Sequence, residues 1–164
     1  MLPKLTESPK NVLTAIAFLS FGAVGAALFS QHVLGMLPCA WCIFQRLLFI
    51  LIGALAVLGA LTGSRPIMRF SLLLVILISI AGVAAAWHQM TVAAQSFSCD
   101  QTLADRIVVG SGLDGAMPWL FGIYATCMDA AVSILGLDFA AWSLLLYVVF
   151  AGACVLSLRR SKTS

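Results

Sequence analysis

Four long apolar runs constrain this chain more than any other feature of its sequence. They span residues 12–29, 43–62, 70–87 and 139–158. A helix needs roughly 20 apolar residues to cross the ~30 Å hydrocarbon core of a bilayer. Only helices and closed barrels satisfy their own backbone polar groups there, and these runs are too long and too continuously apolar for barrel strands. The sequence therefore predicts an all-α membrane protein, a four-transmembrane-helix bundle that forms one membrane domain over residues 1–164.

Composition excludes two broad classes of protein. Apolar residues make up 62% of the chain and charged residues only 9%, whereas about a quarter of the residues in a soluble domain are charged. The chain therefore has too little polar surface for a soluble enzyme. Its formal net charge of +3 is too small to predict nucleic-acid binding, so we expect the lipid bilayer as its environment and no nucleic-acid partner.

Lysine and arginine are distributed unequally between the two ends of the predicted spans. Seven of them lie in the two tails and in the short connection between the second and third spans: Lys4, Lys10, Arg65, Arg69, Arg159, Arg160 and Lys162. The connections 30–42 and 88–138 contain only Arg106. The positive-inside rule then predicts cytoplasmic termini, a short outer loop at 30–42 and a long outer loop at 88–138. The first run exceeds the ~7–15 residues of a signal-peptide core, so we expect it to be retained as a span.

Four of the five cysteines lie in or beside the predicted outer loops, namely Cys39, Cys42, Cys99 and Cys127. Disulfides persist outside the cytosol and are rare within it, so we expect these four to be able to form two disulfides. Cys154 lies inside the last span, where a buried thiol packs and does not react. Structural zinc favours two closely spaced ligand pairs, but 27 residues separate Cys99 from Cys127. We therefore expect no metal site.

Cys39 and Cys42 form a C-x-x-C directly before the second span. A disulfide across two residues closes a very small ring, which gains little as a structural staple, and strained pairs tend to be labile or catalytic. The N-terminal end of a helix favours a thiolate. Arg46 follows Cys42 by four residues, on the same helix face, and favours the thiolate too. An interfacial arginine that extends toward the headgroups is the alternative, but an ionisable residue in a span indicates a functional site.

Three other residues, Cys99, Cys127 and His88, each allow a structural and a functional interpretation. Cys99 and Cys127 could staple the long loop, or they could exchange a disulfide with the C-x-x-C through thiolate attack. His88 lies at the outer end of the third span, where it could be merely interfacial. It is also expected at the depth of Cys42 and Arg46, where a polar group could bind a small ligand between helices.

Taken together, these features resemble the bacterial disulfide bond formation protein B family, DsbB, over nearly the whole chain. The most specific element is a C-x-x-C followed by an arginine four residues after its second cysteine. The segments that carry the resemblance are Gln-His-Val at 31–33, Leu-Pro-Cys-Ala-Trp-Cys-Ile-Phe-Gln-Arg at 37–46 and Leu-Gly-Leu-Asp at 135–138. The chain departs from the best-known members at Gln45, where they have a glutamate.

The resemblance implies a quinone-dependent thiol oxidase of the bacterial inner membrane, with its active cysteines on the periplasmic side. Such a protein reoxidises a periplasmic thioredoxin-fold disulfide donor of the DsbA kind. By position, Cys99 would be attacked by the donor's thiolate, and Cys127 would be its disulfide mate. Cys39 and Cys42 would reoxidise that pair and deliver electrons to ubiquinone or menaquinone. Arg46 and His88 would help to hold the quinone head.

Two other classes of protein compete with this interpretation. A non-catalytic scaffold with four spans and a stapled outer loop, of the tetraspanin kind, has no use for a short reducible pair beside Arg46. A quinone reductase of the vitamin K epoxide reductase type also joins C-x-x-C chemistry to membrane helices. Its C-x-x-C is expected late in the chain, within a span, whereas Cys39 and Cys42 precede the second of four predicted spans.

Overall fold

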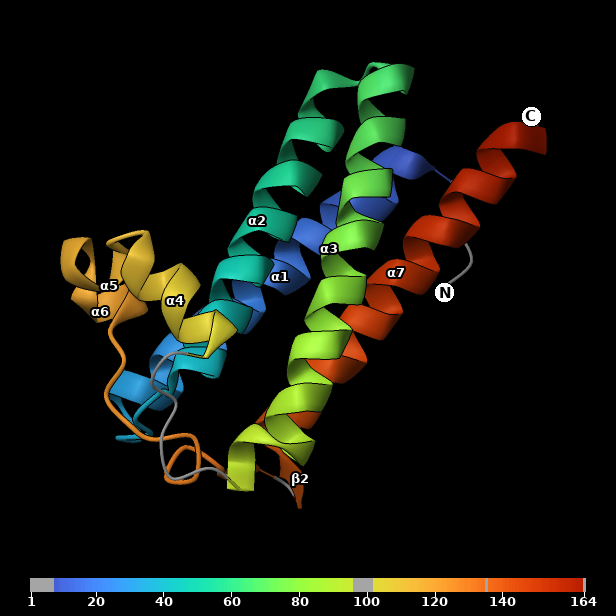
Figure 1. The fold of residues 1–164 in the computed structure, drawn as a ribbon. Helices are drawn as coiled ribbons and strands as arrows, with labels where there is room; N and C mark the ends of the chain where they lie inside the picture. Colours follow the sequence, from blue (N-terminus) through green and yellow to red (C-terminus); the bar gives the residue numbers. More distant parts are fainter. Residues whose placement is uncertain (1–7, 96–101, 135, 164) are drawn as a thin grey trace.

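The computed structural model describes residues 8–95, 102–134 and 136–163, and within them four long helices dominate the fold (Figure 1). These are α1 (Pro9–His32), α2 (Ala40–Thr62), α3 (Arg65–Thr91) and α7 (Phe139–Thr163). Each contains one of the apolar runs, and each is long and apolar enough to cross a membrane. The predicted all-α, four-transmembrane-helix architecture is therefore confirmed.

Local sequence signals set the ends of these helices. A proline occupies the first turn of both α1 and α3, where its missing N–H costs nothing because that position has no partner inside the helix. Gly63 ends α2 in the left-handed conformation, with φ 61°, which glycine adopts without strain. Cys39 precedes α2 in an extended conformation, so the C-x-x-C straddles the point where the chain enters the helix.

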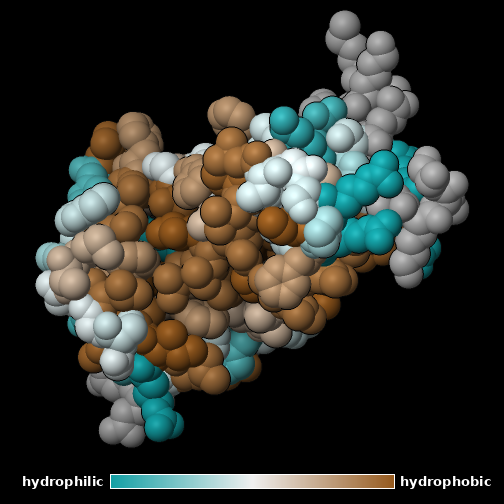
Figure 2. Space-filling model, turned by 90° about the horizontal axis from the view of Figure 1, so that it is seen from above, coloured by the Kyte–Doolittle hydropathy of each residue, from teal (hydrophilic) through white to brown (hydrophobic). Residues whose placement is uncertain are grey.

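The helices run antiparallel in sequence order, and α2 and α3 are joined by a tight turn at one end of the bundle (Figure 1). The most extensive helix contacts are those of α3 with α7, α1 with α2, and α2 with α3. The start of α1 and the end of α7 share the end that carries Arg65 and Arg69. Figure 2 shows apolar side chains across the middle of one face, with hydrophilic residues toward both ends. That distribution suits a body surrounded by hydrocarbon.

The long connection between α3 and α7 lies at the other end of the bundle and beside α2 (Figure 1). Its elements are η1 (Ala93–Gln95), α4 (Leu103–Gly110), α5 (Leu113–Ala116), α6 (Pro118–Phe121), β1 (Ser133–Ile134) and β2 (Leu137–Asp138). β1 and β2 pair antiparallel, with Ser133 opposite Asp138. Val108 of α4 and Phe121 of α6 share a buried cluster with Ile43 of α2, which holds these short helices against the bundle.

Close helix packing in the core depends on Gly82 of α3. Its Cα faces the Tyr147 ring of α7, which is fully buried. That ring stacks on Phe49 of α2, with centroids 4.4 Å apart and planes 11° apart. The Tyr147 hydroxyl donates to the backbone oxygen of Gln45, 3.0 Å away. Because a small residue lets backbones approach closely in membranes, Gly82 allows Tyr147 to link three helices.

We expect Gly82→Ala to lower the free energy of unfolding by about 1–3 kcal/mol, because an added methyl overpacks a filled core. The new Cβ would lie 2.6 Å from the Tyr147 ring. Gly152→Ala on α7 is the matched control, since a Cβ there meets nothing within 4 Å. Thermal unfolding in detergent micelles checks both variants. Equal midpoints for the two would contradict this account of the core.

Candidate functional site

The C-x-x-C forms a pair of free thiols at the beginning of α2. The two sulfur atoms are 3.2 Å apart. Cys39 is fully buried, and Cys42, in the first turn of the helix, is partly exposed. The hydrogen bond with the Cys42 sulfur, together with burial, raises the pKa of the Cys39 thiol well above its usual range. Cys42 is therefore the accessible member of the pair.

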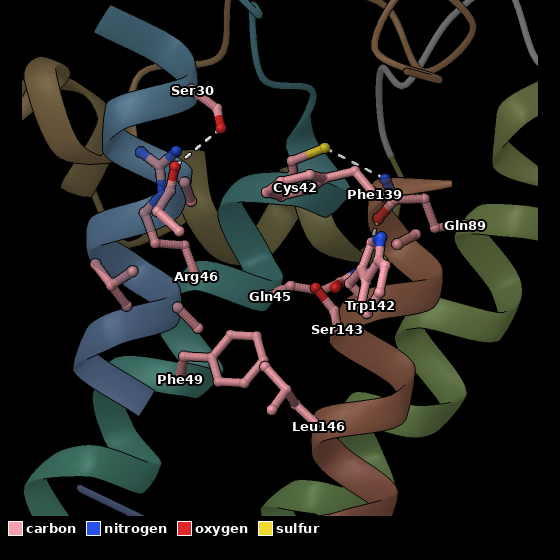
Figure 3. A pocket seen from close by; sticks show the side chains of 15 residues that line it. Ser30, Cys42, Gln45, Arg46, Phe49, Gln89, Phe139, Trp142, Ser143 and Leu146 are labelled. Carbon is pink, nitrogen blue, oxygen red and sulfur yellow. Dashed lines mark hydrogen bonds between the residues drawn. The ribbon is translucent and has the colours of Figure 1, made fainter. Parts of the chain in front are cut away.

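The partly exposed Cys42 lines a cavity of about 360 Å³ between α1, α2, α3 and α7 (Figure 3). The side of the cavity that faces α1 is formed by small residues, Ala23, Ala26 and Ala27. Phe49 and Leu146 form part of its apolar wall. A mostly apolar cavity of roughly 300–1,000 Å³ with a few convergent polar groups is typical of a small-molecule site. Here those polar groups gather beside a thiol.

Arg46 lines the same cavity and is 4% exposed. Its Nη1 donates to the Gln31 side chain of α1, 2.9 Å away, and to the backbone oxygen of Leu120 in α6. Among the described residues, its buried Nε–H has no partner. A buried donor without a partner is costly, so this N–H suits an acceptor oxygen on a ligand. Arg46 thus connects α2, α1 and the long loop at the cavity wall.

Sequence reasoning missed Gln89, which contacts the reactive pair from α3. Its Nε2 lies 3.2 Å from the Cys42 sulfur (Figure 3). Its Oε1 accepts from the Gln45 side chain of α2, 2.5 Å away. Both amides are buried. The available signal was an amide near the C-terminal end of an apolar helix, directly after His88.

His88 itself lies elsewhere. Its imidazole packs against the Trp41 ring, with centroids 4.6 Å apart, and His88 is not among the residues that line the cavity. The structure therefore brings Cys39, Cys42 and Arg46 together, whereas His88 is beside the C-x-x-C on the Trp41 side. Its role at a ligand stays a prediction.

The long loop brings Cys127 to the same region. Cys127 is buried and disulfide-bonded, and it belongs to one buried cluster with Cys39. The backbone N–H groups of Tyr124 and Ala125 both donate to the carbonyl of Pro38, at 3.0 and 3.2 Å. The segment before Cys127 is thus tied to the residue before Cys39. Cys99 lies outside the described residues.

Cys154 occupies a different environment from the other cysteines. It is a free thiol in α7, fully buried in the main helix core with Tyr147 and Phe150. It does not line the cavity beside Cys42. The structure therefore separates this packed thiol from Cys39, Cys42 and Cys127.

Comparison with known proteins agrees with this arrangement. The family model described as Disulfide bond formation protein DsbB matches residues 9–157. The chain is 33% identical over 155 residues to Disulfide bond formation protein B 1 of Pseudomonas savastanoi pv. phaseolicola, covering 92% of each protein. It is 33% identical over 156 residues to Disulfide bond formation protein B of Pseudomonas syringae pv. tomato, again with 92% of each covered. For the Ralstonia nicotianae protein of that name the identity is 30%, over 88% of this chain and 91% of the relative.

We expect Arg46→Ala to loosen α6, because the guanidinium bond to the Leu120 carbonyl is lost. A hydrogen bond to a charged group contributes about 1.5–3 kcal/mol, so amide hydrogens in α6 should exchange about tenfold faster or more. Hydrogen exchange read by mass spectrometry measures this, with α3 peptides as the internal reference. Arg106→Ala is the control, since Arg106 is exposed on α4 of the same loop. Unchanged exchange in Arg46→Ala would show that this bond does not hold the loop.

Proposed function

Because the chain belongs to the disulfide bond formation protein B family, it is a disulfide-generating oxidoreductase, and we propose that it reoxidises a DsbA-like periplasmic thiol oxidase. Electrons would pass through two cysteine pairs to a membrane quinone, ubiquinone or menaquinone. The protein would span the bacterial inner membrane several times, with both termini cytoplasmic and its active cysteines in the periplasm. The observation that carries this proposal is a free C-x-x-C whose second sulfur opens into an apolar cavity beside Arg46.

The residues around the cavity fit a quinone. Its walls are apolar, as a membrane-soluble ring and chain require, and Arg46 offers a buried Nε–H without a partner among the described residues. Arg46 would hold a head-group oxygen, with Phe49 and Leu146 against the ring or its chain. When bound, the quinone supplies an acceptor for two electrons and two protons. His88, whose ring packs against Trp41 with the planes 33° apart, stays a proposed second contributor.

The proposed relay is a series of thiol–disulfide exchanges. The donor's dithiol reduces the disulfide of Cys99 and Cys127 and leaves as a disulfide. The resulting Cys99 and Cys127 thiols then reduce a Cys39–Cys42 disulfide and return to their own disulfide. Cys39 and Cys42, now thiols, reform their disulfide by releasing two electrons and two protons. Burial of Cys39 and Cys127 in one cluster supports exchange between the two pairs.

The two cysteines of the C-x-x-C are placed differently, and this suits them to different steps of the proposed relay. Cys39 is fully buried beside the loop, while Cys42 is the member that lines the cavity. Cys39 thus suits exchange with Cys127, and Cys42 suits transfer to the acceptor. A DsbA-type donor has a potential near about −120 mV, so its reoxidation needs an acceptor more oxidising than most protein disulfides. A quinone dissolved in the bilayer meets that requirement.

The first test is turnover by the purified protein with a reduced DsbA-type donor and added quinone, following quinone absorbance and thiol loss together. We expect one quinone reduced for each disulfide formed. Serine at Cys39, Cys42, Cys99 or Cys127 should abolish turnover, because each substitution interrupts an exchange. Cys154→Ser is the matched control and should stay active, since Cys154 is buried away from the cavity. An active Cys42→Ser protein would refute the relay.

A second test fills the cavity. Ala27→Phe is expected to raise the KM for quinone by about tenfold or more, since overpacking of this size costs ~1–3 kcal/mol. Exchange between the cysteine pairs, followed without quinone, should be unchanged. Gly25→Phe is the control on the same helix, because a Cβ at Gly25 meets nothing within 4 Å. Equal KM values for the two variants would exclude this cavity as the quinone site.

A further inference from the structure

A pair of buried amides stands directly beside the reactive thiol. Gln45 and Gln89 are 4% and 7% exposed, and they meet between α2 and α3. Gln45 lies one turn from Cys42 on the same helix, and Gln89 approaches from the neighbouring helix (Figure 3). Buried amides in an apolar region are costly unless they are hydrogen-bonded. The burial of these two amides beside a thiol therefore indicates a functional role.

The hydrogen bonds give the pair a direction. Gln45 donates its Nε2 to Gln89 Oε1, which leaves the Gln89 amino group as the end that faces sulfur. That group lies 3.2 Å from the Cys42 sulfur and 4.0 Å from the Cys39 sulfur. An amide nitrogen can only donate in such a contact. Gln89 therefore presents an N–H to Cys42 in preference to Cys39.

A donor aimed at sulfur acts on the charged form of the thiol. A neutral thiol is a weak acceptor, whereas hydrogen bonds to an ionised group are roughly twice as strong as neutral ones. Donation to the charged form therefore favours that form. The direction depends on Gln45, because without its N–H the Gln89 amide could turn its oxygen toward the sulfur.

We propose that Gln89 is a further catalytic residue, which holds the Cys42 sulfur as a thiolate through its amide N–H, and that Gln45 is the positioning residue that orients this amide. The proposal rests on the proposed function, in which Cys42 delivers electrons at the cavity. Gln89 also lines a second, smaller cavity, and Cys127 lines that cavity too. Gln89 thus stands between the quinone cavity and the side from which the second cysteine pair approaches.

The test measures alkylation of Cys42 by iodoacetamide against pH, in the full-length protein in detergent and without quinone. A Cys39→Ser background leaves Cys42 unable to form its C-x-x-C disulfide, and mass spectrometry assigns the modified site. We expect Gln89→Leu to move the midpoint up by about one pH unit and to slow alkylation near neutral pH by up to about tenfold. At high pH, where the thiolate forms in any variant, the rates should converge.

A second variant tests orientation. Gln45→Leu keeps the Gln89 donor but removes the N–H that fixes its direction, so we expect a smaller shift of the midpoint in the same direction. Thr91→Ala is the matched control, since Thr91 is exposed on α3 and its hydroxyl bonds to the Trp87 carbonyl of its own helix. Its midpoint should equal that of the parent. Arg46 and His88, the other charged or titratable groups nearby, are retained in every variant.

The outcomes separate the two proposals. An unchanged midpoint in Gln89→Leu, or a rate lowered equally at every pH, would overturn the role of Gln89. If Gln89→Leu does not fold, Gln45→Leu decides, and an unchanged midpoint there overturns the proposal. Quinone-dependent turnover of the unsubstituted protein, with Cys39 intact, is measured in parallel. Absent turnover would refute the proposed relay, whereas normal turnover with unshifted midpoints would refute only this inference.

Discussion

The need to satisfy polar groups at the depth of the bilayer governs the rest of this structure. Water cannot complete their hydrogen bonds there, so Arg46, Gln45 and Gln89 must find partners on neighbouring helices or in the loop. Arg46 does so across α1 and α6, and the two glutamines do so across α2 and α3. These bonds gather three buried polar side chains at one end of the bundle. The reactive thiols lie at the same place.

The long loop depends on the same end of the bundle for its position. The Pro38 carbonyl accepts two backbone N–H groups from the segment before Cys127, and Arg46 donates to the Leu120 carbonyl. The residues on either side of the C-x-x-C therefore act as anchors for the loop that carries the other cysteines. A disulfide exchange between loop and helix needs this closeness, because thiolate attack requires contact between sulfur atoms. Loop position and cavity are consequently coupled through Arg46.

Helix packing explains why a cavity exists at all. α1 packs mainly on α2 and α7 mainly on α3, so the space between α1 and α7 near Cys42 is left to small side chains such as Ala26 and Ala27. Further along the bundle Gly82 admits the Tyr147 ring, which is fully buried. Small residues thus serve close packing in one layer and leave room for a ligand in another. Gly82 faces a large aromatic ring, which fills the space beside it, whereas Ala26 and Ala27 face the cavity.

The sequence by itself determined the four helices, the place of the C-x-x-C at the start of the second, and Arg46 one turn further on. Hydropathy and helical spacing are local properties, so they needed no knowledge of neighbours. Only the tertiary structure decided that Gln89 rather than His88 contacts the Cys42 sulfur. Adjacent helical residues point about 100° apart, and the rotation of α3 against α2 selects between them. That rotation depends on packing between helices, such as the contact of Gly82 with Tyr147, which involves residues far apart in the chain.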